Sequence, residues 1–142
     1  MKAKEYLQRI SKIDRIIINK VVELNQWKSI AMGTTIQLTE KVQTSSNGQM
    51  MANAVCTYID IEKDIARCVN ELAAEKKEII KTIEQIDDEL YYDILHKIYV
   101  QYLTFQDVAD DYDKSKSWVT SKNGTALKKL QDILDERKDK NE

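Results

Sequence analysis

The stretch Thr104–Leu130, TFQDVADDYDKSKSWVTSKNGTALKKL, has the signals of two helices joined by a sharp turn. Thr104 can cap the first helix, with the acid of its capping box at Asp107. Asp113 tolerates the left-handed conformation that such a turn often needs, and Ser115 can cap the second helix. The apolar residues of the second helix recur at helical spacing: Val119, Ala126, Leu127, Leu130, Ile133 and Leu134. The stretch therefore predicts a helix-turn-helix.

Charge distinguishes the two predicted helices. Five lysines and no acid lie between Lys114 and Gln131, whereas the preceding helix carries Asp107, Asp110 and Asp111. Phosphate groups attract cations and repel carboxylates, so only the second helix can face DNA.

A family resemblance rests on the pattern Val108-Ala109, three residues, Asp113, then Ser115, Val119, Ala126-Leu127 and Leu130. It resembles the fourth conserved region of bacterial sigma factors, which reads the upstream promoter element. Most of the chain is also similar to small phage-encoded regulators of Gram-positive hosts, including late-gene activators of the ArpU and RinA type. The sequence departs from the sigma pattern at three positions: Asp113 replaces the usual turn glycine, Lys114 an apolar residue, and Lys122 a buried one.

The resemblance implies which residues contact DNA. Four would face the bases: Lys116, Ser117, Thr120 and Ser121. Three would contact phosphates: Lys114, Lys128 and Lys129. Lys122 and Asn123 remain unassigned, and Trp118 can either pack against the preceding helices or contact a partner. Gly124 lies inside a helix that we expect to be continuous, where close approach of DNA or another helix would explain the missing side chain.

The composition predicts an all-α protein. The 142 residues include no proline and three glycines, so long helices are permitted almost everywhere. We expect a long antiparallel helical hairpin, coiled-coil-like, followed by a C-terminal three-helix domain with the helix-turn-helix. The expected divisions are 1–86 for the hairpin, 87–135 for the helix-turn-helix domain and 136–142 for a charged tail.

Two apolar repeats predict the hairpin. Residues at steps of three and four run from Ala3 to Trp27, interrupted by Lys20, and a second set recurs every seven residues from Tyr58 to Ile86. Lys20 and Lys76 either set the register or extend to water at the edge of the seam. The predicted seam of the hairpin or oligomer consists of Ile10, Ile17, Leu24, Tyr58, Ile65, Leu72, Ile79 and Ile86. A second copy of the chain would cover the leftover apolar surface.

Residues 28–49 lose this period and contain Gly33, Thr34-Thr35 and Asn47-Gly48, which favour turns. They predict a flexible loop, or a segment that becomes ordered on a partner. Beyond the hairpin, the acids at 87–89 favour the start of a helix that contributes Leu90 to Tyr102 to the core of the C-terminal domain.

The charge balance limits how tightly DNA can bind. The whole chain has a net charge of −2, and residues 87–142 carry nine basic and thirteen acidic groups, a net charge of −4. An isolated module with this balance should bind DNA weakly, so we expect a homo-oligomer, a dimer or larger, or help from host RNA polymerase.

No signal for catalysis is found. His96 is the single histidine, without a metal-ligand cluster, and no nucleophile and base are paired, so we expect no enzyme, cofactor or metal. No run of eighteen apolar residues predicts a membrane span, and we expect a cytoplasmic protein of a bacterial host.

Two functions remain open at this point. The first is a phage or prophage transcription regulator, an activator by resemblance, that binds promoter DNA through residues 114–130 and oligomerises through its N-terminal helices. The alternative is a helical adaptor or antagonist that binds RNA polymerase or another regulator without touching DNA. The acidity of the C-terminal half favours the alternative.

Overall fold

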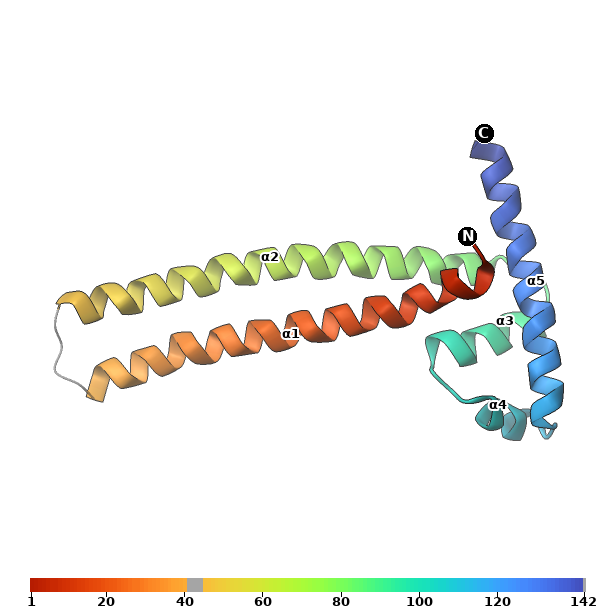
Figure 1. Ribbon diagram of the computed structural model, residues 1–142, viewed down its shortest axis with the longest axis horizontal. Helices are drawn as coiled ribbons and strands as arrows, with labels where there is room; N and C mark the ends of the chain where they lie inside the picture. The colour runs from red at the N-terminus through yellow and green to blue at the C-terminus, as the bar shows by residue number, and fades with distance from the viewer. Residues whose placement is uncertain (41–44, 142) are drawn as a thin grey trace. The chain divides into compact units, whose positions relative to one another are not determined.

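The chain is all-helical over the residues that its computed structural model describes, 1–40 and 45–141, with side chains described outside 33–48 and 51. This confirms the predicted all-α class. The elements in order are α1 (Ala3–Glu40), α2 (Ser45–Glu84), α3 (Glu89–Leu95), the π-helical turn η1 (His96–Val100), α4 (Phe105–Tyr112) and α5 (Lys116–Asn141) (Figure 1).

The predicted loop 28–49 is helical over most of its length. Because α1 continues to Glu40 and α2 begins at Ser45, Gly33 and the two threonines after it lie inside α1. Each such residue costs a helix at most about 1 kcal/mol, and extending an existing helix needs no new nucleus. Weak breakers without a proline therefore do not end α1, and residues 41–44 of the predicted loop lie outside the described residues.

The chain divides into two compact units. One contains Met1–Asp14 together with Ala74–Glu142, and the other contains Arg15–Ala73. The helical chain breaks at residues 85–88, where we expected the domain boundary, but both the start of α1 and the end of α2 belong to the same unit as the C-terminal helices.

In the first unit, the start of α1 lies antiparallel to the end of α2. Arg9 binds Glu75 through two nitrogens, with Nε 2.6 Å and Nη2 3.1 Å from the carboxylate oxygens. Nζ of Lys76 lies 2.8 Å from Oδ1 of Asp14. Lys76 therefore pairs across the two helices, whereas Lys20, in the other unit, pairs with Glu23 of its own helix.

The predicted seam residues are shielded to different degrees. Ile10, Ile65, Ile79 and Ile86 are buried, and Ile17, Leu24, Tyr58 and Leu72 are half-buried. Figure 1 shows α1 and α2 next to each other within each unit. The four buried residues are covered within one chain, so they offer no surface to a second copy.

The C-terminal helices enclose a small core. Ile94 of α3, Val108 and Ala109 of α4 and Val119 of α5 are completely buried and pack together. A surrounding shell is partly buried: Leu90, Ile98, Leu103, Phe105, Tyr112 and Trp118. The helices contribute to one core as predicted, but the predicted core residues Tyr91, Leu95, Tyr99, Tyr102 and Leu127 are not part of this cluster.

Tyr102 does not lie in the core. It has φ of 61° and is 50% exposed, so it follows the end of the helical segment rather than extending it. The helix unwinds through η1, where the N–H of Gln101 donates to the carbonyl of His96 and that of Leu103 to Lys97. The Tyr102 hydroxyl instead donates to the carboxylate of Asp14.

The charged segment that follows residue 135 continues as helix. α5 ends at Asn141, so residues 136–141 are helical and not an irregular tail. The helix can continue because the segment contains neither proline nor glycine, and its last turn carries Lys138 and Lys140, whose charge suits a helix C-terminus.

Candidate nucleic-acid interface

The start of α4 is defined by a complete capping box. The Oγ1 of Thr104 accepts a hydrogen bond of 3.1 Å from the N–H of Asp107, and the carboxylate of Asp107 accepts one of 3.0 Å from the N–H of Thr104. Two otherwise unpaired N–H groups at the helix start are thus satisfied. The structure confirms this cap as predicted.

The turn after α4 depends on Asp113. This residue has φ of 53° and ψ of 44°, the left-handed conformation expected from the sequence. The N–H of Lys114 donates to the carbonyl of Ala109 at 2.9 Å, and that of Asp113 to Asp110 at 3.2 Å. These two bonds are those of a Schellman motif, so an aspartate here performs the role that glycine usually takes.

Ser115 begins α5 two residues later. Its Oγ accepts a hydrogen bond of 3.0 Å from the N–H of Trp118, and its carbonyl accepts one of 3.2 Å from Val119. α5 then runs without interruption from Lys116 through Gly124, which confirms the continuous helix. The turn of three residues between α4 and α5 therefore holds the two helices at a defined angle.

One side of α5 packs inward. Val119, Asn123, Ala126 and Leu130 are its buried residues, at steps of four, three and four. Asn123, left unassigned by the sequence, is thus a buried residue. Its Oδ1 has no hydrogen-bond partner among the described residues.

The opposite side of α5 is polar and open. Ser117, Ser121 and Lys128 are exposed and share this side, because they are four and seven residues apart. Gly124, between Ser121 and Lys128, lies on the same side. Lys116 and Thr120 are exposed beside them, and the Thr120 hydroxyl also donates to the carbonyl of Lys116 at 3.0 Å. The four residues predicted to face bases therefore lie together near the start of α5. We call this surface the outer side of α5: residues 116, 117, 120, 121, 124 and 128.

Gly124 has no role in the packing of the chain. A Cβ added at this position would meet no atom within 4 Å among the described residues. A glycine in a helix costs roughly 1 kcal/mol relative to alanine, and here no contact within the described structure offsets that cost.

A row of lysines and aromatic rings flanks the outer side of α5. Nζ of Lys122 lies 6.0 Å from the ring centre of Tyr91 and 5.9 Å from that of Trp118. Lys129 lies 5.3 Å from Tyr91, and Lys114 5.8 Å from Trp118. Cation–π contacts of this kind hold ammonium groups at the surface while their charge stays available to a phosphate.

The three predicted phosphate contacts do not all lie in this row. Lys114 and Lys129 belong to the lysine and aromatic row, whereas Lys128 belongs to the outer side of α5. Lys122, which departs from the sigma pattern, is half-buried between two rings and joins the row. Sequence reasoning missed Tyr91, because this residue comes from α3 and no local signal relates it to lysines 31 and 38 residues later.

Trp118 packs against its own chain. It is half-buried, contacts the C-terminal core, and its ring centre lies 5.5 Å from that of Tyr112. Its remaining exposed edge lies among the lysines of the row, so Trp118 both completes the core and supports Lys114 and Lys122.

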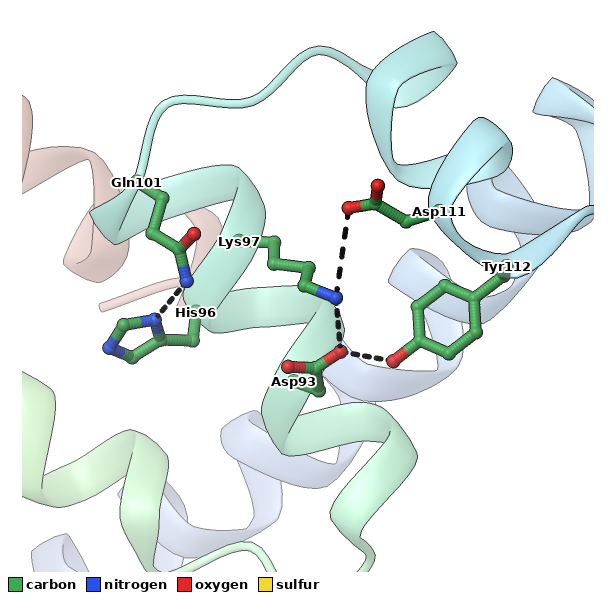
Figure 2. A network of polar contacts seen from close by, with 6 residues as sticks. All are labelled: Asp93, His96, Lys97, Gln101, Asp111 and Tyr112. Atoms are coloured by element: carbon green, nitrogen blue, oxygen red, sulfur yellow. Dashed lines mark hydrogen bonds and ion pairs between the residues drawn. The ribbon is translucent and has the colours of Figure 1, made fainter.

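A polar network fixes α4 against α3 (Figure 2). The Tyr112 hydroxyl donates to the carboxylate of Asp93, and Nζ of Lys97 lies 2.9 Å from Asp93 and 3.8 Å from Asp111. The same ammonium lies 4.9 Å from the ring centre of Tyr112. These contacts hold the end of α4, and through it the start of α5.

The network shifts two pKa values in opposite directions. Partial burial alone would raise the pKa of Asp93, but the hydrogen bond from Tyr112 and the ammonium of Lys97 together lower it. Burial and the neighbouring Asp93 carboxylate raise the pKa of Tyr112, so the phenol stays protonated and continues to donate.

His96 lies at the edge of the same network. Its Nδ1 is 2.9 Å from Nε2 of Gln101, and its ring centre is 5.7 Å from that of Tyr92. Among the side chains that the structure describes, which leave out 33–48 and 51, no three of His, Cys, Asp or Glu gather as metal ligands would. In that same part of the chain, no helix is both long and apolar enough to cross a membrane.

Comparisons with protein-family models, with curated proteins and with solved structures find no significant match to this chain.

Proposed function

We propose that the chain is a DNA-binding transcription regulator in which α4 and α5 form a helix-turn-helix and α5 enters the major groove. The observation that carries the proposal is the outer side of α5, where Lys116, Ser117, Thr120, Ser121 and Lys128 are exposed with no acid among them. A helix of this character, packed on one side against the core and open on the other, fits the width of the major groove.

The lysine and aromatic row adds a place for the DNA backbone. Lys114, Lys122 and Lys129 lie on one flank of the outer side of α5. In the proposed complex, Lys116 is the residue able to bind guanine O6 and N7, and the serines and threonine discriminate less. Affinity then comes mainly from phosphates and falls steeply with salt.

One copy of this helix-turn-helix should bind DNA only weakly. Residues 87–142 carry a net charge of −4, which repels DNA at long range. Two copies joined through their N-terminal helices would add their contacts in one binding event and offset this repulsion. The resemblance to sigma region 4 and to phage late-gene activators makes phage or prophage promoters the expected targets.

Footprinting on DNA next to the gene for this protein, over a salt series, tests the proposal. Lys116→Ala should weaken binding and relax the preference for guanine at one position, a loss of roughly 1–3 kcal/mol. Lys128→Ala should weaken binding to every sequence and lower the slope of log K against log salt by about one unit.

Lys63→Ala is the matched control, because Lys63 is an exposed lysine of the Arg15–Ala73 unit, far along the chain from α5. It removes one positive charge without touching the outer side of α5. Wild-type binding that neither the Lys116 nor the Lys128 change weakens would end the proposal.

A second candidate function is an adaptor that binds RNA polymerase or another regulator without DNA. The exposed acids of α4, Asp107, Asp110 and Asp111, favour it, since they are the part of this unit least suited to DNA. Recovery of a polymerase subunit from nuclease-treated lysate would support this function if no DNA is protected. If Asp110→Lys no longer recovers the subunit while Lys128→Ala still does, the contact with polymerase is made by α4.

A further inference from the structure

Exposed apolar side chains gather in the Arg15–Ala73 unit. Of the eleven large hydrophobic residues that are exposed in the described part of the chain, nine belong to this unit. Ile18 is 61% exposed and Met32 56%, far above the fully buried Ile94 and Val119 of the C-terminal core. Exposed apolar residues that occur together mark a surface for a partner, whereas isolated ones need no explanation.

Ile18, Val22 and Met32 belong to a second row on α1, distinct from the inward one, whereas Val21, Trp27 and Ile30 lie outside this row. The inward row includes Ile17, Leu24 and Ala31, which are half-buried or buried. The second row is Ile18, Val22, Asn25, Ser29 and Met32, all exposed and spaced by four, three, four and three residues. That spacing is the one by which a helix packs along another helix, so α1 has two such stripes where a simple hairpin needs one.

α2 repeats the arrangement on the same side. Val55 and Ile59 are exposed and four residues apart, and Glu62 and Ala66 continue the row. Met32 and Val55 line one hollow of about 180 Å³, together with Lys28, Ala31 and Tyr58, so the two rows border the same groove. We name this surface the apolar face: Ile18, Val22, Met32, Val55 and Ile59.

Within this unit the two helices carry net charges of opposite sign. Residues 15–32 of α1 carry three basic groups and one acid, a net charge of +2, and residues 50–73 of α2 carry two basic groups and four acids, a net charge of −2. When two such faces meet so that α1 of one chain lies on α2 of the other, opposite charges pair twice. Packing like helices together would bring equal charges into contact.

We propose that the apolar face binds a second copy of this chain, forming a four-helix assembly in which α1 and α2 alternate. An eighteen-residue stretch such as 15–32 is roughly 27 Å long, and two helices side by side are roughly 20 Å wide. A face of that size is roughly 540 Å² in projection, near the lower end of the roughly 600–1,000 Å² per partner that specific interfaces bury. Asn25, in the middle of an α1 row that also contains Ser29, fixes the register, as a polar residue does in a helical seam.

This interface supplies the pairing that the proposed DNA reader needs, but its existence does not depend on DNA binding. Ile10 and Ile65 of the predicted hairpin or oligomer seam are buried within one chain, so they are not part of this face.

The test is the mass of the full chain in solution without DNA, by sedimentation velocity over a range of concentrations. The wild type should exceed the 16.5 kDa of one chain, as a dimer or a larger assembly. Ile18→Glu combined with Val22→Glu places four carboxylates at the interface of a dimer and should raise the dissociation constant about tenfold or more. Circular dichroism should show unchanged helix content, because both side chains are exposed in the single chain.

Asn19→Glu combined with Thr57→Glu is the matched control. It adds the same charge at exposed positions of α1 and α2 that lie outside both rows, and it should leave the mass unchanged. If the Ile18 and Val22 variant loses helix content, Ile59→Glu on α2 takes its place.

A wild type that stays at the mass of one chain up to about 100 μM, or an assembly that both face variants leave intact, overturns the inference. Either result leaves the footprint on DNA as a separate question. A dimer that protects no DNA would instead end the proposed function and leave the apolar face as a self-association site.

Discussion

The C-terminal helices and the Arg15–Ala73 unit use apolar residues in opposite ways. Short helices α3 and α4 are each closed by a cap and bury their large side chains, as Ile94 and Val108 show with no exposed surface at all. The two long helices of the other unit leave Ile18, Val22 and Ile59 exposed. The C-terminal helices bury their large apolar residues and expose the polar outer side of α5. The Arg15–Ala73 unit leaves large apolar residues exposed.

The largest expected difference comes from deleting apolar side chains in the two regions. Ile94→Ala leaves a cavity in the C-terminal core and should cost about 2–5 kcal/mol of unfolding free energy. Ile18→Ala removes a side chain that is already exposed in one chain and should cost at most about 0.5 kcal/mol at concentrations where the chain is monomeric. Urea unfolding followed by circular dichroism measures both, and equal costs would contradict the contrast.

The turn between α4 and α5 should respond next most strongly. Asp113→Ala places a residue without a polar side chain in the left-handed conformation and should destabilise the C-terminal helices by about 1 kcal/mol. Asp113→Gly should be neutral or stabilising, since glycine takes this conformation without steric cost. Thermal melts of the two variants give the comparison, and an equal loss for both would show that the aspartate side chain, not the backbone angle, matters.

Acid should affect the C-terminal unit through Asp93 and Asp14. Both carboxyls are partly buried, and the hydrogen bonds from Tyr112 and Lys97, or from Lys76 and Tyr102, still lower their pKa values. A folded-state pKa below the unfolded value adds stability that is fully present above about pH 4, the ordinary range of aspartate, and is lost as the pH falls through the lowered values.

Melting temperatures measured from pH 7 to pH 2 test this effect. Asp93→Asn should be less stable than the wild type at pH 7 but should lose less on acidification. A pH profile for Asp93→Asn parallel to that of the wild type would show that this carboxyl makes no contribution.

The smallest effect on stability is expected at Gly124, where the substitution should stabilise the protein instead of destabilising it. Gly124→Ala meets no atom within 4 Å and should stabilise the helix by up to about 1 kcal/mol. If DNA approaches the outer side of α5 closely, the same methyl group should weaken binding. Thermal melting measures the change in stability, and a gel shift on the same preparation measures the change in DNA affinity. A variant that is more stable and binds DNA equally well would show that DNA does not approach Gly124 closely.

Local signals explain why part of the candidate site was predictable. The capping box of Thr104, the left-handed Asp113 and the cap at Ser115 each involve groups within about five residues, so residue type and spacing suffice to find them. The limits of α1 were not predictable in the same way. Gly33 and the threonines after it are weak helix formers, and whether they end a helix depends on what precedes and surrounds them.

Sequence by itself determined the helical class, the apolar repeats and the caps that place α4 and α5, because these depend on contacts between near neighbours along the chain. Only the tertiary structure decided that Asn123 turns inward, that Tyr91 holds Lys122 and Lys129, and that Lys76 pairs with Asp14 while Lys20 pairs within its own helix. Those contacts join different elements, or depend on which side of a helix the rest of the chain covers. No local pattern encodes that choice, so it is made when the helices pack.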